Sequence, residues 1–152
     1  MNKPKKISLP ELIAKCQIDT NCNDWAEIGT IGIELGTFIN NTTGVDVKDY
    51  RIVVEGSSLI HSINRHGIGS NDRNPIDFTD FFCLPEIIKK PENIRKRDNS
   101  KLSNNKRLIF EKTIGHTFYC IEEIREGYKK GQRIAFVSLW KRIIDEKQKP
   151  LK

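Results

Sequence analysis

The chain has 152 residues, 37% of them hydrophobic, and a formal net charge of +6. This suits one globular domain that buries a core without disulfides or a metal. No apolar run approaches the roughly 20 residues of a membrane span, and Pro10, Glu11 and Lys15 interrupt the only candidate signal peptide. We therefore expect a cytoplasmic protein with no membrane partner, although delivery to another cell would leave no mark in the sequence.

The first half of the chain predicts two helices and a strand. Ser8 and Glu11 have the spacing of a capping box ahead of an apolar stripe, which predicts a helix near residues 9–17. Apolar residues recur at helical spacing over 31–40, and the polar run that follows to Gly44 ends that helix. The β-branched run 50–54 predicts a strand.

The segment 60–69 places two histidines and an arginine on one helical end. A helix that starts with Ser57 or Ser58 as N-cap and stops at a left-handed Gly67 puts His61 and Arg65 one turn apart, with His66 in the last turn. Histidine passes protons near neutral pH, and arginine offers phosphate a permanent charge. The same cations also suit a helix C-terminus without any catalytic role.

The segment that follows predicts an accessible loop and then a helix. Gly69 to Pro75 is rich in glycine, asparagine and proline, so we expect an irregular loop that leaves the His66 end open. Asp77 or Thr79 can cap a helix from Asp80 to about Lys89.

Charge is concentrated in the second half of the chain. Residues 1–60 hold six of the 26 Lys and Arg residues and eight of the 20 Asp and Glu residues. A mobile basic loop is predicted where cations crowd among Asn and Ser, and we expect it either to bind RNA or to be merely solvated. Its cations are Arg95, Lys96, Arg97, Lys101, Lys106 and Arg107.

The last third predicts an antiparallel meander of strands over 107–112, 116–125 and 132–141. Alternation along the third strand puts Ser138 on the same face as Ile134, Phe136 and Trp140. The four cysteines lack metal-site or disulfide spacing, so we expect free thiols, no metal and no cofactor.

Four short motifs, taken in this order, resemble a phage-associated nuclease domain of the barnase, EndoU, colicin-D and RelE (BECR) group. They span residues 59–67, 84–91, 110–112 and 138–141, within a resemblance that covers roughly 44–142. The resemblance implies an α+β fold with helices packed on a small antiparallel sheet. We expect a nuclease domain over 44–145 and a basic tail over 146–152, with residues 1–43 as a helical support segment or the remnant of a larger fusion.

The resemblance also implies metal-independent RNA cleavage between helix and sheet. The residues it assigns to the site are His61, Arg65, His66, Lys112 and Ser138, although a threonine is more usual at the last position. Cleavage through the 2′-hydroxyl needs a base, an acid and cations for the phosphoryl oxygens, which such side chains supply. Either histidine could be the acid or the base, with Arg65 and Lys112 as cations and Ser138 as a hydrogen-bond donor.

We therefore expect a small endoribonuclease, a toxin or a phage or mobile-element nuclease, whose substrate is RNA. Such an activity is harmful to its maker, so an antitoxin or immunity protein with an acidic surface is expected as a partner. The alternatives are a non-catalytic RNA- or protein-binding module on the same fold and an accessory protein that contacts only other proteins.

Overall fold

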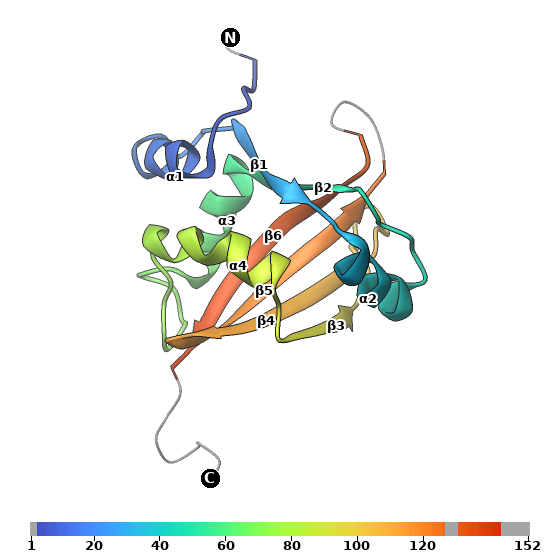
Figure 1. Cartoon of the computed structure of the whole chain (residues 1–152). Coiled ribbons are helices and arrows are strands. Elements are labelled where there is room, and N and C mark those ends of the chain that lie inside the picture. The colour runs from blue at the N-terminus through green and yellow to red at the C-terminus, as the bar shows by residue number, and fades with distance from the viewer. Residues whose placement is uncertain (1–2, 127–130, 144–152) are drawn as a thin grey trace, which may run out of the picture.

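The computed structural model describes residues 3–126 and 131–143 as one six-stranded sheet with helices packed on one of its faces (Figure 1). Within this part of the chain, no helix is long and apolar enough to cross a membrane. The predicted basic tail over 146–152 lies outside the described residues. The elements in chain order are α1 (Leu9–Ile18), β1 (Trp25–Thr30), α2 (Ile33–Thr43), β2 (Arg51–Glu55), α3 (Gly56–His66), the 3-10 helix η1 (Phe78–Cys83), α4 (Leu84–Lys89), β3 (Asn93–Arg97), β4 (Arg107–Ile114), β5 (His116–Arg125) and β6 (Arg133–Arg142).

The strand order in the sheet is β1-β2-β6-β5-β4-β3. The predicted meander of β4, β5 and β6 is confirmed, and so is the α+β class. The sheet is nevertheless larger than expected and mixed, because β2 pairs in parallel with β6 while the other neighbours are antiparallel. The sequence pattern predicts neither β1 nor β3.

The first helix is the one that the sequence predicts most closely. Ser8 Oγ accepts a hydrogen bond from the backbone N–H of Glu11 at 3.2 Å, so the predicted N-cap is present. Leu12, Ile13 and Cys16 are buried against the rest of the core. The second helix starts at Ile33 rather than 31 and ends at a left-handed Gly44.

The third helix differs from its prediction at both ends. It follows β2 directly, with Glu55 at the N-cap position and no side-chain cap from Ser57 or Ser58. Gly56 is required there, because an added Cβ would lie 2.8 Å from the carbonyl oxygen of Cys22. Gly67 is not left-handed (φ −87°), and its N–H bonds to Ile63 O at 2.7 Å.

The predicted helix over 80–89 is divided into η1 and α4. Asp77 caps η1 through a bond from the Thr79 N–H, and its own N–H donates to Asp80. The ring of Phe81 meets Phe136 of β6 edge-on, with centroids 6.0 Å apart. This contact anchors η1 to the helix-covered face of the sheet, which we call the helix side.

The prediction of a mobile basic loop is wrong for the first three cations assigned to it. Arg95, Lys96 and Arg97 belong to β3, which pairs with β4 along its whole length. The turn that follows is held by backbone hydrogen bonds, such as the one of 2.9 Å from Ser100 N to Asn105 O. The prediction followed composition, whereas pairing with β4 decides the conformation.

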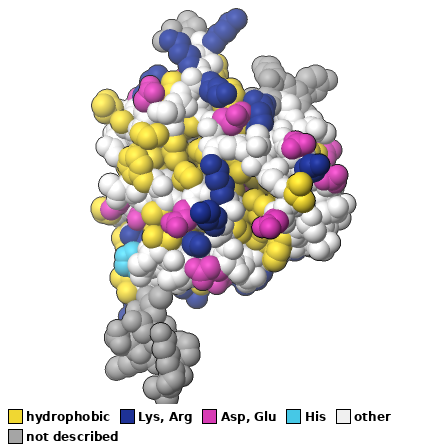
Figure 2. Space-filling view, in the orientation of Figure 1, with side chains coloured by type: hydrophobic (Ala, Val, Ile, Leu, Met, Phe, Trp, Pro, Cys, Tyr) yellow, Lys and Arg dark blue, Asp and Glu magenta, His cyan; other side chains and the backbone are white. Residues whose placement is uncertain are grey.

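The helix side carries no patch of a single charge. Viewed from this side, Lys and Arg side chains are interspersed with Asp and Glu among exposed apolar groups (Figure 2). A shallow pocket on this side lies between α2 and the segment after α4, with Leu35, Phe38 and Ile94 in its lining. The opposite face of the sheet, which we call the open face, is very different.

Candidate active site

Strand register brings arginines together on the open face. Arg51 of β2 pairs with Arg133 of β6, which in turn pairs with Arg125 of β5. One row further along the strands, Glu123 of β5 pairs with Arg107 of β4. Alternate residues of a strand share a face, so these side chains lie side by side on the sheet.

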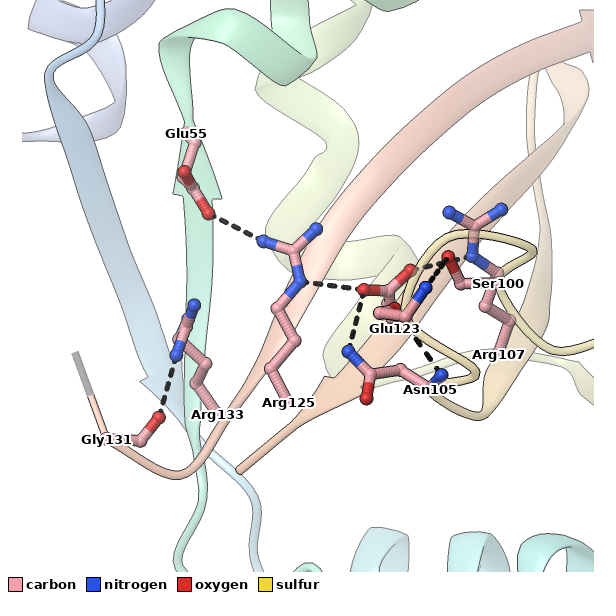
Figure 3. A network of polar contacts seen from close by, with 9 residues as sticks. Glu55, Ser100, Asn105, Arg107, Glu123, Arg125, Gly131 and Arg133 are labelled. Carbon is pink, nitrogen blue, oxygen red and sulfur yellow. Dashed lines mark hydrogen bonds and ion pairs between the residues drawn. The ribbon is translucent and has the colours of Figure 1, made fainter. Parts of the chain in front are cut away.

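A glutamate occupies the centre of this cluster. Glu123 is 3% exposed, and its carboxylate accepts hydrogen bonds from Arg107 Nε at 2.7 Å, Arg125 Nε at 2.9 Å and Asn105 Nδ2 at 3.2 Å (Figure 3). Burial alone would raise the pKa of Glu123, but these hydrogen bonds outweigh it and lower the pKa below its ordinary value. Glu123 is therefore an ionised carboxylate fixed between two guanidinium groups.

The cluster extends through its arginines toward β2. Arg125 Nη1 also donates to Glu55 at 2.8 Å, and Arg133 Nη1 donates to the carbonyl of Gly131 at 2.9 Å (Figure 3). Burial lowers the pKa of Arg133, and the charge of Arg125 lowers it further. Guanidinium groups stay protonated in proteins, but three carboxylates, those of Glu27, Glu55 and Glu123, form ion pairs with arginines of this cluster. The cluster therefore keeps only a small excess of positive charge.

The neighbouring residue, Glu122, lies in an apolar environment on the other face of the sheet. Glu122 is fully buried on the helix side, where it accepts a hydrogen bond from Cys120 Sγ at 3.3 Å. Burial raises the pKa of Glu122 to about 8. The charged cluster therefore belongs to the open face alone.

The third helix, α3, packs beside the part of β6 that lies beyond its pairing with β2. Ser62 Oγ accepts a hydrogen bond from Leu139 N at 2.9 Å and lies 3.1 Å from Leu139 O, to which it donates. Pairing of β2 with β6 ends at Val53 and Ala135. A buried serine thus satisfies the strand edge and fixes the position of the histidine helix.

The last turn of α3 ends against an aromatic pair. His66 Nδ1 lies 2.8 Å from Asp72 Oδ2, and the His66 ring lies 5.5 Å from the centroid of Trp140. Trp140 stacks in turn on Tyr119, with 5.6 Å between centroids. The loop after α3 does not leave His66 open as predicted, because Asp72 reaches back to it.

The remaining predicted catalytic residues are divided between the two faces. His61 and Arg65 are exposed on α3. Lys112 pairs with Phe118, whose ring is buried in the core, so Lys112 lies on the helix side. The structure therefore does not bring Lys112 to the open face with Ser138.

Ser138 changes face because β6 contains an irregularity. Ile121 pairs with Ser138 while Glu122 pairs with Phe136, so Val137 is an extra residue in β6. The prediction that Ser138 shares a face with Phe136 is wrong for this reason. Ser138 lies on the open face, 5% exposed, and its Oγ has no hydrogen-bond partner among the described residues.

The predicted RNA-binding cations do not lie together on one surface. Register places Arg95 and Arg97 on the open face beside Arg107, whereas Lys96 faces the other way. Lys106 Nζ donates to Thr43 O at 2.9 Å, and Lys101 is exposed in the turn. Within the described residues, no group of three or more His, Cys, Asp or Glu is placed to hold a metal ion.

Sequence reasoning missed the centre of this site. Glu123, Arg125 and Arg133 were not singled out, although Glu123 and Arg125 are two residues apart in a predicted strand and must share a face. That spacing was the available signal. The partner strands could not be identified without the sheet order.

Comparison with known proteins supplies the family. A family model described as phage-Barnase-EndoU-ColicinE5/D-RelE like nuclease3 matches residues 30–149. No curated protein and no solved structure matches the chain. Because the model spans most of the chain and the fold agrees with it, this protein belongs to the phage-associated BECR-like nuclease family.

Proposed function

We propose that the protein is a metal-independent endoribonuclease whose active site lies on the open face of the sheet. The observation that carries this proposal is the buried Glu123 carboxylate held between Arg107 and Arg125. Glu123 is ionised but buried, so it acts as the base for a ribose 2′-hydroxyl only when that hydroxyl displaces one of its present donors, such as Asn105 Nδ2. Guanidinium groups stabilise the charge that develops on a phosphoryl oxygen. Family membership supports nuclease chemistry at this site.

The scissile phosphate lies over Ser138 and Ile121 in this proposal. These paired residues occupy the row between Glu123 and the Tyr119–Trp140 pair. The Ser138 hydroxyl is buried and has no hydrogen-bond partner among the described residues, so it donates to a phosphoryl oxygen only after RNA displaces the side chains that cover it. Arg125 then lies on one side of the phosphate and α3 on the other.

The histidine helix supplies the acid. Ser62 is bonded to Leu139, so His61, one residue earlier, lies near the level of Ser138. At about 100° per residue, His61 and Arg65 lie on the side of α3 away from the core-facing Leu59 and Ile63. We assign His61 to protonate the departing 5′-oxygen and Arg65 to contact the phosphate.

The reaction balances without a further reactant. Glu123 takes the proton of the 2′-hydroxyl, whose oxygen attacks the phosphorus and forms a 2′,3′-cyclic phosphate. The bond from phosphorus to the 5′-oxygen breaks, and His61 gives that oxygen a proton. The products are one fragment with a cyclic phosphate and one with a 5′-hydroxyl.

The test is cleavage of a mixed RNA in EDTA, with analysis of the new 3′ ends. Wild type and Glu122→Gln are expected to give cyclic phosphate ends, whereas Glu123→Gln and His61→Ala are expected to leave the RNA intact. Glu122→Gln is the matched control, because it changes the adjacent residue on the other face. RNA that is bound but uncleaved by wild type would contradict the proposal and favour a binding module.

A toxic role follows if the activity is confirmed. The arginines of the open face suit an inhibitor that covers the site with acidic side chains. Expression of wild type alone is expected to slow growth, and expression of Glu123→Gln is not. Equal growth of both strains would argue against a toxin.

A further inference from the structure

An aromatic row lies at the end of the open face opposite the charged cluster. It consists of Tyr119 and Trp140, with His66 beside the indole and Arg142 against the phenol ring. Tyr119 and Trp140 are stacked at 15° between ring planes, and the Arg142 guanidinium carbon lies 5.6 Å from the Tyr119 centroid. Both rings are half-buried and Arg142 is exposed, so the row faces solvent.

We propose that this aromatic row is a subsite that binds a nucleobase of single-stranded RNA by stacking. The inference rests on the proposed function for the identity of the ligand, and it assigns a role to residues that the cleavage step does not use. Aromatic faces bind every base, because each base has a π-face. Single-stranded RNA is selected because only an unpaired base can be turned onto the row.

Trp140 lies next to Tyr119 and His66, and Tyr119 lies next to Trp140 and Arg142, but both aromatic side chains remain partly exposed, and a base would stack on that exposed part. A centroid separation of 5.6 Å at a small interplanar angle means that the two rings are offset rather than superimposed. His66 lies 5.5 Å from the indole at 31° and is itself fixed by Asp72. The row is thus flanked by His66 at one end and Arg142 at the other, and contacts within it order the rings before a base binds, which keeps the ordering cost of binding low.

The position of the row also fits a neighbouring nucleotide. Tyr119 lies four residues from Glu123 on the same face of β5, which is about 13 Å along the strand. A base stacked there belongs to a nucleotide next to the cleaved linkage rather than to the ribose that reacts. Arg142, exposed beside the row, supplies a cation for the connecting phosphate.

Trp140 can report this contact directly. The chain has two tryptophans, so Trp25→Phe leaves Trp140 as the sole indole. The probe is a single-stranded 2′-deoxy oligoadenylate, which lacks the attacking hydroxyl, compared with an abasic strand of the same length. We expect the oligoadenylate to quench Trp140 fluorescence and to bind about 5- to 150-fold more tightly than the abasic strand.

The protein side is tested in the full chain with Trp140→Leu against Phe38→Leu, which alters an exposed aromatic side chain of α2. Trp140→Leu is expected to weaken oligoadenylate binding by a similar factor and to raise KM for RNA more than it lowers kcat. Phe38→Leu, on the helix side, is expected to change neither. Unchanged oligoadenylate binding by Trp140→Leu would contradict the subsite. If Trp140→Leu does not fold, the abasic comparison still decides the question with every side chain except Trp25 intact.

The outcomes separate this inference from the proposed function. Base-dependent quenching without RNA cleavage would support the subsite and overturn the proposed function. RNA cleavage, together with equal binding of the oligoadenylate and the abasic strand and unchanged Trp140 fluorescence, would support the proposed function and overturn the subsite. Absence of binding to either strand would overturn the subsite.

Discussion

Two adjacent glutamates of β5 experience opposite faces of the same sheet. Glu122 is fully buried, 3.3 Å from a thiol, and its pKa rises to about 8. Glu123 is almost as buried, but burial is outweighed by Arg107, Arg125 and Asn105, and its pKa falls. Partners, rather than burial, decide which carboxylate is charged at neutral pH. The open face thus carries an ionised carboxylate among guanidinium groups, whereas the carboxyl on the helix side is largely protonated at pH 7.

The largest expected effect is that of Glu123→Gln. Loss of the base should lower kcat for RNA by about 10²- to 10⁴-fold. Glu122→Gln should leave kcat within about twofold of wild type, since a neutral amide replaces a carboxyl that is largely protonated at pH 7. Steady-state kinetics on one RNA substrate measures both. Equal losses would show that the two faces do not differ in function.

Arg125→Ala is expected to lower kcat by about 10²- to 10³-fold. The change removes the hydrogen bonds to Glu123 and Glu55, so it also raises the pKa of Glu123 and moves the acid limb of the pH profile upward. The pH dependence of kcat/KM measures this shift. Arg125→Lys should restore only part of the rate, because an ammonium lacks the planar fork. Full activity of the alanine variant would place the phosphate elsewhere.

Glu122→Gln should change how the free energy of unfolding depends on pH, although it leaves activity intact. Because the folded pKa of Glu122 lies above its unfolded value, the unfolded state loses the proton first, and stability falls as pH rises from about 4.5 to about 8. The slope is at most about 1.4 kcal/mol per pH unit. Urea unfolding of both proteins between pH 5 and 8 tests this. Parallel curves would mean that Glu122 is ionised in the folded state.

The smallest expected effect is that of Ser62→Ala. Both backbone groups of Leu139 lose their side-chain partner, which should cost about 1–3 kcal/mol of unfolding free energy. His61 and His66 should then be held less well, with a moderate loss of kcat. Ser58→Ala, one turn earlier on the same helix, is the control. Unchanged stability would show that water replaces the hydroxyl.

Periodicity along the chain was sufficient for the elements whose patterns are local. The Ser8 cap, the histidine helix and the three-stranded meander are present. The two edge strands were missed, because pairing with a distant partner stabilises them more than their own composition does. The Gly67 stop failed because contact with Ile63 sets that turn.

Of the candidate site, the sequence predicted only the residues that α3 contributes. His61, Arg65 and His66 lie on one short segment, so they could be found by spacing. Glu123 meets Arg107 only through the register of β4 with β5. Ser138 reaches the open face because of one extra residue in β6, which alternation cannot reveal.

The most direct test of the open-face active site uses a DNA oligonucleotide that contains a single ribonucleotide. In EDTA, wild type should cut it only after that ribose and leave a 2′,3′-cyclic phosphate, Glu122→Gln should cut it as wild type does, and Glu123→Gln should leave it whole. Cutting of the all-DNA strand, or undiminished cutting by Glu123→Gln, would contradict the account.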